Sequence, residues 1–143
     1  MSRFSIENKV LDVESLRLSL ENFSAGALVT FEGRVRNQNE GREVLALEYE
    51  AHVPLAEKEG GEILKEALAK FGILEIVCLH RVGKLALGDV AVWVGVIAKH
   101  RKAAFKACEF VIDEVKHRVP IWKKEHYSSG QAEWVNCAGC KHP

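Results

Sequence analysis

The 143-residue sequence has no excess of charge of either sign, because 20 Lys and Arg residues balance 20 Asp and Glu residues. A chain without net charge exerts no long-range attraction on nucleic acids or anionic membranes. We therefore expect neither as a partner. Any anion-binding site must come from basic residues that cluster locally.

Long hydrophobic runs are also missing. No segment reaches the roughly 18 consecutive apolar residues of a membrane-spanning helix, and the N-terminal residues 1–15 lack the apolar centre of a signal peptide. We therefore expect a cytoplasmic protein. Its four cysteines are then expected to be free thiols, because disulfides are rare in the cytoplasm.

The sequence contains no internal repeat, no low-complexity segment and no linker between two domains. A chain of this length fits one domain and buries roughly 68–70% of the surface that it exposes when unfolded. We therefore expect residues 1–143 to form a single domain, with a flexible tail at residues 136–143.

Hydrophobic periodicity predicts an α+β fold. Apolar residues recur at helical spacing in three segments, 12–22, 55–71 and 100–118. Strand patterns occur at 26–35, 44–51, 73–82 and 89–98, with a short one at 131–136. A polar loop is expected at 36–42, and residues 119–127 are expected to be extended because Pro120 ends the third helix. Helices and strands mix without a strict β-α-β repeat, which favours α+β.

Several side chains carry more specific expectations. The buried stripe of the third helix is predicted to consist of Phe105, Cys108, Ile112 and Val115. The buried face of strand 44–51 is predicted to carry Leu45, Leu47, Tyr49 and Ala51. The segment 89–98 is apolar on both faces, which is typical of a central strand. His80 and Arg81, at a strand end, are expected to be structural.

The stretch KHRVPIWKKE at residues 116–125 concentrates positive charge around two rigid apolar residues. Lys116 lies in the last helical turn, and Lys123 follows on an extended segment that Pro120 and Trp122 can hold in place. The two ammonium groups could converge on one pocket, where like charges lower each other's pKa. Alternatively, these cations only complement the helix dipole.

Two further basic clusters are candidates for anion binding. Lys99, His100 and Arg101 lie at the positive end of a helix dipole, where a bound anion would compensate their charge. Arg34 and Arg36 point the same way from a strand and could grip phosphate or carboxylate through two hydrogen bonds each. A solvated turn and a solvated strand end are the alternatives.

The cysteines give weaker signals. Cys137 and Cys140 have CxxC spacing, but the β-α-β context of a redox motif and the four ligands of a zinc site are both missing. We therefore expect no metal site. Cys78 and Cys108 fall on apolar faces and are expected in the core.

Several motifs together resemble the large, catalytic subunit of molybdopterin synthase, the MoaE family. The resemblance covers roughly residues 24–125 in the order of the family. Its motifs are FEGRVRNQNEG (31–41), LEYEAH (47–52), HRVGKLALGD (80–89), HRKAAF (100–105) and VPIWKKE (119–125), the last preceded by Lys116.

The resemblance implies a fold, a reaction and partners. The fold is an α/β hammerhead core with a smaller β-rich insertion. The enzyme is a sulfurtransferase of molybdenum cofactor biosynthesis that needs no cofactor of its own. A homodimer binds two small ubiquitin-like sulfur-carrier subunits, giving a heterotetramer. Each carrier inserts a C-terminal Gly-Gly thiocarboxylate, and two sulfurs pass to cyclic pyranopterin monophosphate (precursor Z) to form the dithiolene of molybdopterin.

The resemblance also implies site residues. The catalytic lysines of the family fall on Lys116 and Lys123. Its substrate-binding or anion-binding residues fall on Arg34, Arg36, His100, Arg101, Lys124 and Glu125. The family more often has Lys-Val-Arg where this chain has Arg34-Val35-Arg36, so the positive charge is kept.

Two rival functions stay open from the sequence. The basic clusters could form a non-catalytic anion-binding or nucleic-acid-binding module, although few aromatic residues alternate with them. Cys137 and Cys140 could instead serve a thiol or metal protein.

Overall fold

The computed structural model describes residues 2–135 of the chain. The elements follow one another as β1 (Ser2–Glu7), α1 (Val13–Ser19), β2 (Ala27–Arg34), β3 (Gln38–Asn39), β4 (Arg42–Ala51), α2 (Val53–Phe71), β5 (Glu75–Arg81), β6 (Gly83–Ala86), β7 (Val90–Ala98), α3 (Arg101–Arg118), β8 (Ile121–Tyr127) and β9 (Ala132–Val135).

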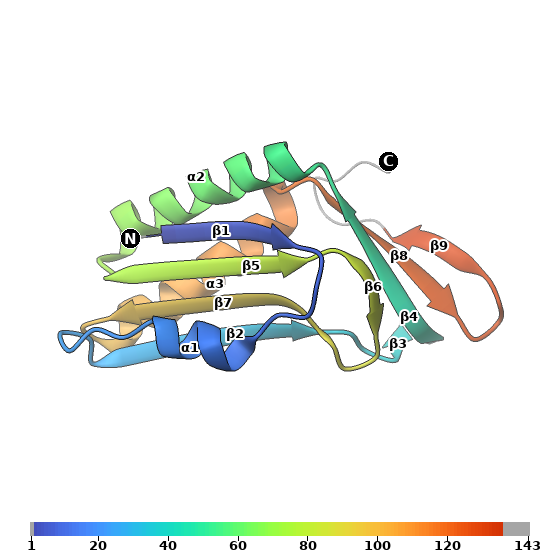
Figure 1. Ribbon diagram of the computed structural model, residues 1–143, viewed down its shortest axis with the longest axis horizontal. Helices are drawn as coiled ribbons and strands as arrows, with labels where there is room; N and C mark the ends of the chain where they lie inside the picture. Colours follow the sequence, from blue (N-terminus) through green and yellow to red (C-terminus); the bar gives the residue numbers. More distant parts are fainter. Residues whose placement is uncertain (1, 136–143) are drawn as a thin grey trace.

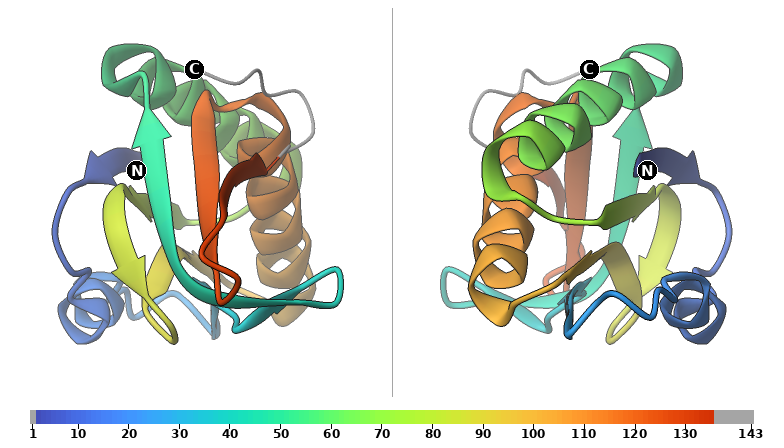
Figure 2. Two further views of the ribbon diagram at one scale, coloured as in Figure 1. Left: turned by 90° about the vertical axis from the view of Figure 1, so that its right-hand side faces the viewer. Right: turned by 90° about the vertical axis from the view of Figure 1, so that its left-hand side faces the viewer.

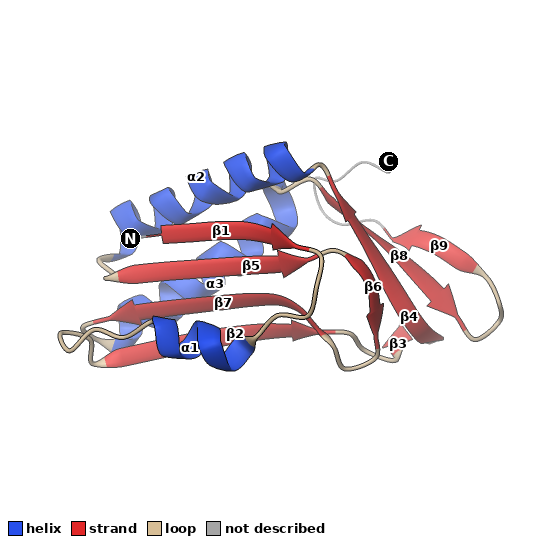
Figure 3. Cartoon of the chain, viewed as in Figure 1, coloured by secondary structure: helices blue, strands red, loops and turns tan. Residues whose placement is uncertain are grey.

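The strands form two sheets (Figure 1). The first sheet has the order β1-β5-β7-β2, with β1 parallel to β5 and the other pairs antiparallel. The second sheet has the order β3-β4-β8-β9. Strand β6 also pairs with β4, along the edge that faces away from β8. Helices and mixed strands confirm the predicted α+β class, with a helix-covered part beside a smaller part built of strands (Figure 3).

Helices cover both faces of the first sheet. Helices α2 and α3 lie on one face and α1 lies on the other (Figure 2). Strand β7 alternates between the two apolar clusters: Val94 packs toward α2 and α3, and Trp93 packs toward α1. Both side chains are fully buried, so the prediction that this strand is central is confirmed.

The helix boundaries follow local signals in the sequence. The Asp12 side chain accepts the Ser15 backbone N–H at 3.1 Å and so caps α1. Gly72 ends α2 in the left-handed conformation, with φ of 62°. Val119 follows α3 in an extended conformation, because Pro120 disfavours helical geometry in the residue before it.

Three strands were not predicted. Residues 2–7 form β1, in which Phe4 aligns with Cys78 of β5 and lies against Gly60 of α2. The expected loop 36–42 contains β3, which forms a hairpin with the start of β4, and the short β6 pairs with β4. Each owes its conformation to a strand partner that local periodicity does not show.

Two side-chain predictions were wrong. Phe105 is 61% exposed, because the buried stripe of α3 runs through its neighbours Ala104 and Cys108. Leu45 is 53% exposed and Val44 is fully buried, because the register of β4 against β8 shifts between Val44 and Ala46. A bulge of this kind moves one side chain to the opposite face.

No helix in residues 2–135 is both long and apolar enough to cross a membrane.

Candidate active site

A cavity of about 740 Å³ lies where the two sheets meet the C-terminal half of α3. Residues of β2, β5 and β7 line it from the first sheet, and residues of β4 and β8 line it from the second. Small-molecule sites typically occupy roughly 300–1,000 Å³, so this cavity can hold one ligand of modest size.

The cavity is positively charged in a chain that is neutral as a whole. Among the described residues, four basic side chains and two carboxylates line it: Arg34, Arg36, Lys116, Lys123, Glu32 and Glu125. Arg34, Arg36 and Lys116 are exposed, whereas Lys123 is half-buried and Glu125 is buried, so water screens the last two charges least. The cavity is therefore suited to an anionic ligand.

The end of α3 and the start of β8 bring two lysines to the same cavity. Lys116 lies in the last turn of α3, and the chain reverses through Val119 and Pro120 into β8, where Lys123 follows. Both lysines line the cavity. Trp122 directly precedes Lys123 in β8, so its side chain lies on the opposite face of the strand, where it is half-buried.

The pKa of Lys123 lies below its ordinary value. Burial of the ammonium group is the largest cause, and the positive charges of Lys116 and Arg36 lower the pKa further. The carboxylate of Glu125 acts in the opposite direction. Burial and the neighbouring cations thus give Lys123 an amine that releases its proton more readily than a surface lysine does.

Glu125 is fixed at the wall of the cavity by neighbours on β3 and on its own strand β8. Its side chain is 4% exposed. Oε1 accepts hydrogen bonds from Asn39 Nδ2 at 2.8 Å and from the Tyr127 hydroxyl at 2.9 Å, and Oε2 lies 3.9 Å from Lys123 Nζ. This buried carboxylate is therefore hydrogen-bonded and sits beside the lysine whose proton affinity it raises.

Lys124 does not face the cavity. Successive side chains of a strand alternate, so Lys123 and Glu125 share one face of β8 and Lys124 lies on the other. There its Nζ lies 5.7 Å from the centre of the Trp134 ring on β9.

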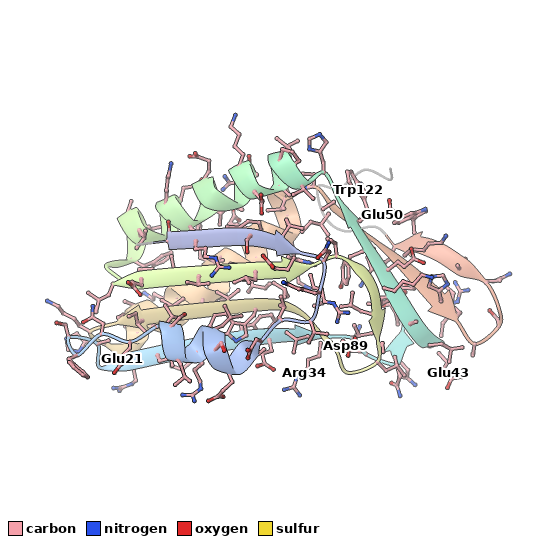
Figure 4. The ribbon with its side chains drawn as sticks, in the orientation of Figure 1. Glu21, Arg34, Glu43, Glu50, Asp89 and Trp122 are labelled. Atoms are coloured by element: carbon pink, nitrogen blue, oxygen red, sulfur yellow. The ribbon has the colours of Figure 1, made fainter. Side chains whose placement is uncertain are left out.

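Arg34 and Arg36 line the cavity together at the end of β2. The buried Val35 separates them in the chain, just beyond the end of β2. Arg34 pairs with Glu32 at 2.8 Å and lies at the outer edge of the molecule near Asp89 (Figure 4). Arg36 is exposed and contributes its charge to Lys123.

His100 and Arg101 lie at the other end of α3. His100 occupies the N-cap position without a side-chain capping bond, and both residues are exposed. Fifteen residues separate Arg101 from Lys116, which corresponds to roughly 22 Å along a helix. Within one copy of the chain, this cluster does not reach the cavity.

Comparison with known proteins identifies the family to which this chain belongs. The model of the MoaE protein family matches residues 6–118. The chain belongs to the MoaE family. The resemblance seen in the sequence motifs is therefore confirmed.

Individual relatives of this MoaE chain support the same family membership. The molybdopterin synthase catalytic subunit of Pyrococcus abyssi is 42% identical over 136 residues, which are 94% of this chain and 91% of that protein. The structure of molybdopterin synthase from Staphylococcus aureus superposes with a TM-score of 0.88 at 37% identity, covering 95% of this chain and 98% of that one. A complex of subunits 1 and 2 of molybdopterin-converting factor from Helicobacter pylori shares the fold, with a TM-score of 0.76 at 21% identity over 93% and 90% of the two chains.

The cavity of this MoaE chain contains two residues that sequence reasoning had not placed in the site. Tyr49 and His80 both line it, with ring centres 4.9 Å apart and planes at 73°. Burial, with the charge of Glu125 as a second cause, raises the pKa of Tyr49 to about 12. The motifs that contain them, LEYEAH and HRVGKLALGD, carry the only signal in the sequence that could have drawn attention to these two residues.

The cysteines of this MoaE chain divide into two groups. Cys78 and Cys108 are buried free thiols in the main core, as predicted, and burial raises the pKa of both. Cys137 and Cys140 lie outside the described residues. Within residues 2–135, no group of three or more His, Cys, Asp or Glu side chains could hold a metal ion.

Proposed function

We propose that this chain is the catalytic subunit of a molybdopterin synthase, a sulfurtransferase of molybdenum cofactor biosynthesis. It transfers sulfur from the C-terminal thiocarboxylate of a small ubiquitin-like carrier subunit to cyclic pyranopterin monophosphate, forming the dithiolene of molybdopterin. Family membership and the names of the relatives support this proposal.

The observation that carries the proposal is the convergence of Lys116 and Lys123 on one basic cavity. A thiocarboxylate and a cyclic phosphate are both anions, and several cations directed at one cavity stabilise an anion bound there. Because the sulfur arrives on the carrier, no cysteine of this chain has to act as a nucleophile.

The residues at the cavity suggest a division of roles. Lys116 acts on the thiocarboxylate or on the covalent intermediate that it forms. Lys123, with its lowered pKa, assists proton transfer, and Glu125 raises its proton affinity. Arg34 and Arg36 hold the phosphate or the pterin through charge-assisted hydrogen bonds.

The proposed assembly contains two copies of this chain and two carriers. His100 and Arg101 lie roughly 22 Å along α3 from Lys116, so they can join the same site only if a second copy presents them. The two-subunit complex of the Helicobacter pylori protein is consistent with a small partner. The role of Lys124, on the face away from the cavity, is then contact with a partner or support of β9. We also propose that residues 1–143 act as one domain in the cytoplasm.

The test is reconstitution with purified components. The protein is mixed with a thiocarboxylated carrier and cyclic pyranopterin monophosphate, and the dithiolene product is measured. Lys116→Ala is expected to abolish most of the turnover while the protein stays folded. Lys65→Ala is the matched control, because Lys65 is 72% exposed on α2 and pairs only weakly with Glu62 at 3.7 Å. Near-normal turnover by Lys116→Ala would refute the assignment.

Deletion of residues 136–143 addresses the thiol or metal alternative. If Cys137 and Cys140 are not part of the reaction, the shortened protein transfers sulfur at the rate of the full chain. A loss of turnover together with a loss of bound metal would favour the alternative.

A further inference from the structure

His80 lies on the floor of the cavity and has no role in the reaction proposed above. It belongs to the end of β5, where its Cα pairs with Ile6 of β1 and Val92 of β7. The side chain is 8% exposed, and the residue lines the cavity together with Tyr49 and Lys116. A buried polar ring that lines the cavity can form a hydrogen bond with the ligand that fills it.

The hydrogen bonding of the ring fixes its tautomer. Nδ1 lies 2.9 Å from the backbone carbonyl oxygen of Arg81. A carbonyl oxygen only accepts hydrogen bonds, so Nδ1 carries the proton and a neutral ring leaves Nε2 as an acceptor. The edge-to-face contact with Tyr49 at 4.9 Å holds the plane of the ring.

The surroundings of His80 keep the ring neutral. Burial lowers its pKa to about 4, the hydrogen bond to Arg81 opposes this shift, and the charge of Lys116 adds to it. Lys123 and Arg36 add further positive charge at the same cavity, while Glu125 is held by its own hydrogen bonds and by Lys123. His80 is therefore a neutral acceptor in a basic cavity across the physiological pH range.

Within residues 2–135 the His80 ring makes its only hydrogen bond through Nδ1, so Nε2 is available to a ligand. The basic side chains can bind an anionic group of the ligand, whereas Nε2 can accept a hydrogen bond from an N–H or O–H donor. A ligand that satisfies both carries an anion and a polar heterocycle, which is the chemistry of a phosphorylated pterin.

We propose that His80 is a specificity-determining residue whose Nε2 accepts a hydrogen bond from an N–H or O–H of the pterin. This inference rests on the proposed function. The basic residues hold the anionic end of the substrate, and His80 distinguishes the ring system at the other end. A ligand without such a donor leaves a buried acceptor unpaired, which weakens its binding.

The test compares three variants by calorimetric titration with cyclic pyranopterin monophosphate. His80→Leu keeps apolar volume and removes the acceptor, so Kd is expected to rise tenfold or more, the size of one lost hydrogen bond to a buried group. His80→Gln restores an acceptor and is expected to recover most of the affinity. Cys78→Ala, two residues earlier on the same face of β5 and fully buried, controls for a loss of packing alone.

The ranking of the variants by affinity distinguishes a hydrogen-bonding role of His80 from a packing role. If His80 only packs, the Leu variant binds at least as well as the Gln variant, and the inference is overturned. Nitrogen-15 NMR gives an independent check on the wild-type protein, because long-range correlations show which ring nitrogen carries the proton. A proton on Nε2 would also overturn it. Failure of the wild-type protein to bind this substrate at all would instead count against the proposed function.

Discussion

Arg118 is expected to be a main source of stability between α2 and α3, and replacing it with methionine tests this. Its guanidinium bonds both oxygens of Glu66 at 2.8 Å, Glu59 at 2.9 Å and Glu114 at 3.3 Å. Glu59 and Glu66 lie on α2, so these bonds tie the last turn of α3, which carries Lys116, to the neighbouring helix. Methionine keeps the apolar stem and removes the charge.

The expected loss follows from the exposure of the partners. Arg118 is 24% exposed, and the three carboxylates are 32–46% exposed, so water screens each pair in part. Exposed pairs contribute roughly 0.2–1 kcal/mol each, and the two-bond contact with Glu66 lies at the upper end of that range. The network therefore contributes about 2 kcal/mol, or roughly 4–8 °C in Tm.

The pH dependence has a definite sign. The hydrogen bond from Arg118 holds the pKa of Glu66 below its ordinary value of 4.5. A carboxyl group with a lowered pKa stabilises the fold at neutral pH, and this contribution disappears as the pH falls through the pKa of the folded state. The difference between wild-type and Arg118→Met is therefore expected to be full at pH 7 and to shrink in acid.

Urea denaturation at low salt measures the difference, with Lys65→Met as the control for an exposed pair on the same helix. Lys65 and Glu62 are 72% and 51% exposed, so this control is expected to change the free energy of unfolding by less than about 0.5 kcal/mol. An Arg118→Met effect no larger than that of the control would refute the reasoning. An effect that does not weaken in concentrated salt would show that packing, and not charge, carries it.

Three further predictions concern β1 and the cavity. Gly60→Ala is expected to lower the free energy of unfolding by about 1–3 kcal/mol, because the new methyl group meets the Phe4 ring. The control Gly61→Ala places its methyl group in open space and is expected to be neutral or stabilising. Equal melting temperatures of the two variants would contradict this. Lys123, whose pKa is lowered and whose side chain is 33% exposed, is expected to react faster with amine reagents in mildly alkaline buffer than the exposed lysines do, as peptide mass spectrometry can show. Glu125→Gln removes the charge that raises the pKa of Lys123, so the pH–rate profile is expected to move to lower pH; an unmoved profile would exclude Lys123 as the titrating group.

The sequence predicted the elements whose signals are local. Helices α2 and α3 have long apolar stripes and clear stops at Gly72 and Pro120. Strand β1 was missed because it lies at the edge of its sheet and pairs with a strand some 70 positions later, a contact that no local pattern contains. The bulge in β4 changed which of Val44 and Leu45 is buried for the same reason.

The same distinction applies to the candidate site. The convergence of Lys116 and Lys123 was predictable because one helix end and one proline separate them in the sequence. Tyr49 and His80 come together only when β4 and β5 meet at the cavity, so their burial could not be inferred locally. The predicted helix 100–118 already placed His100 and Lys116 at opposite ends, but only the folded chain shows that the cavity lies at the Lys116 end.

The position of β8 has a consequence for how the protein is made. This strand fills the middle of the second sheet and carries Lys123 and Glu125, yet it is among the last described segments to leave the ribosome. Until it arrives, one edge of the ten-residue strand β4 has no partner, and an open edge invites pairing with other chains. Completion of the site and protection of the nascent chain from aggregation are therefore a single event, and a chain stopped after α3 would lack both.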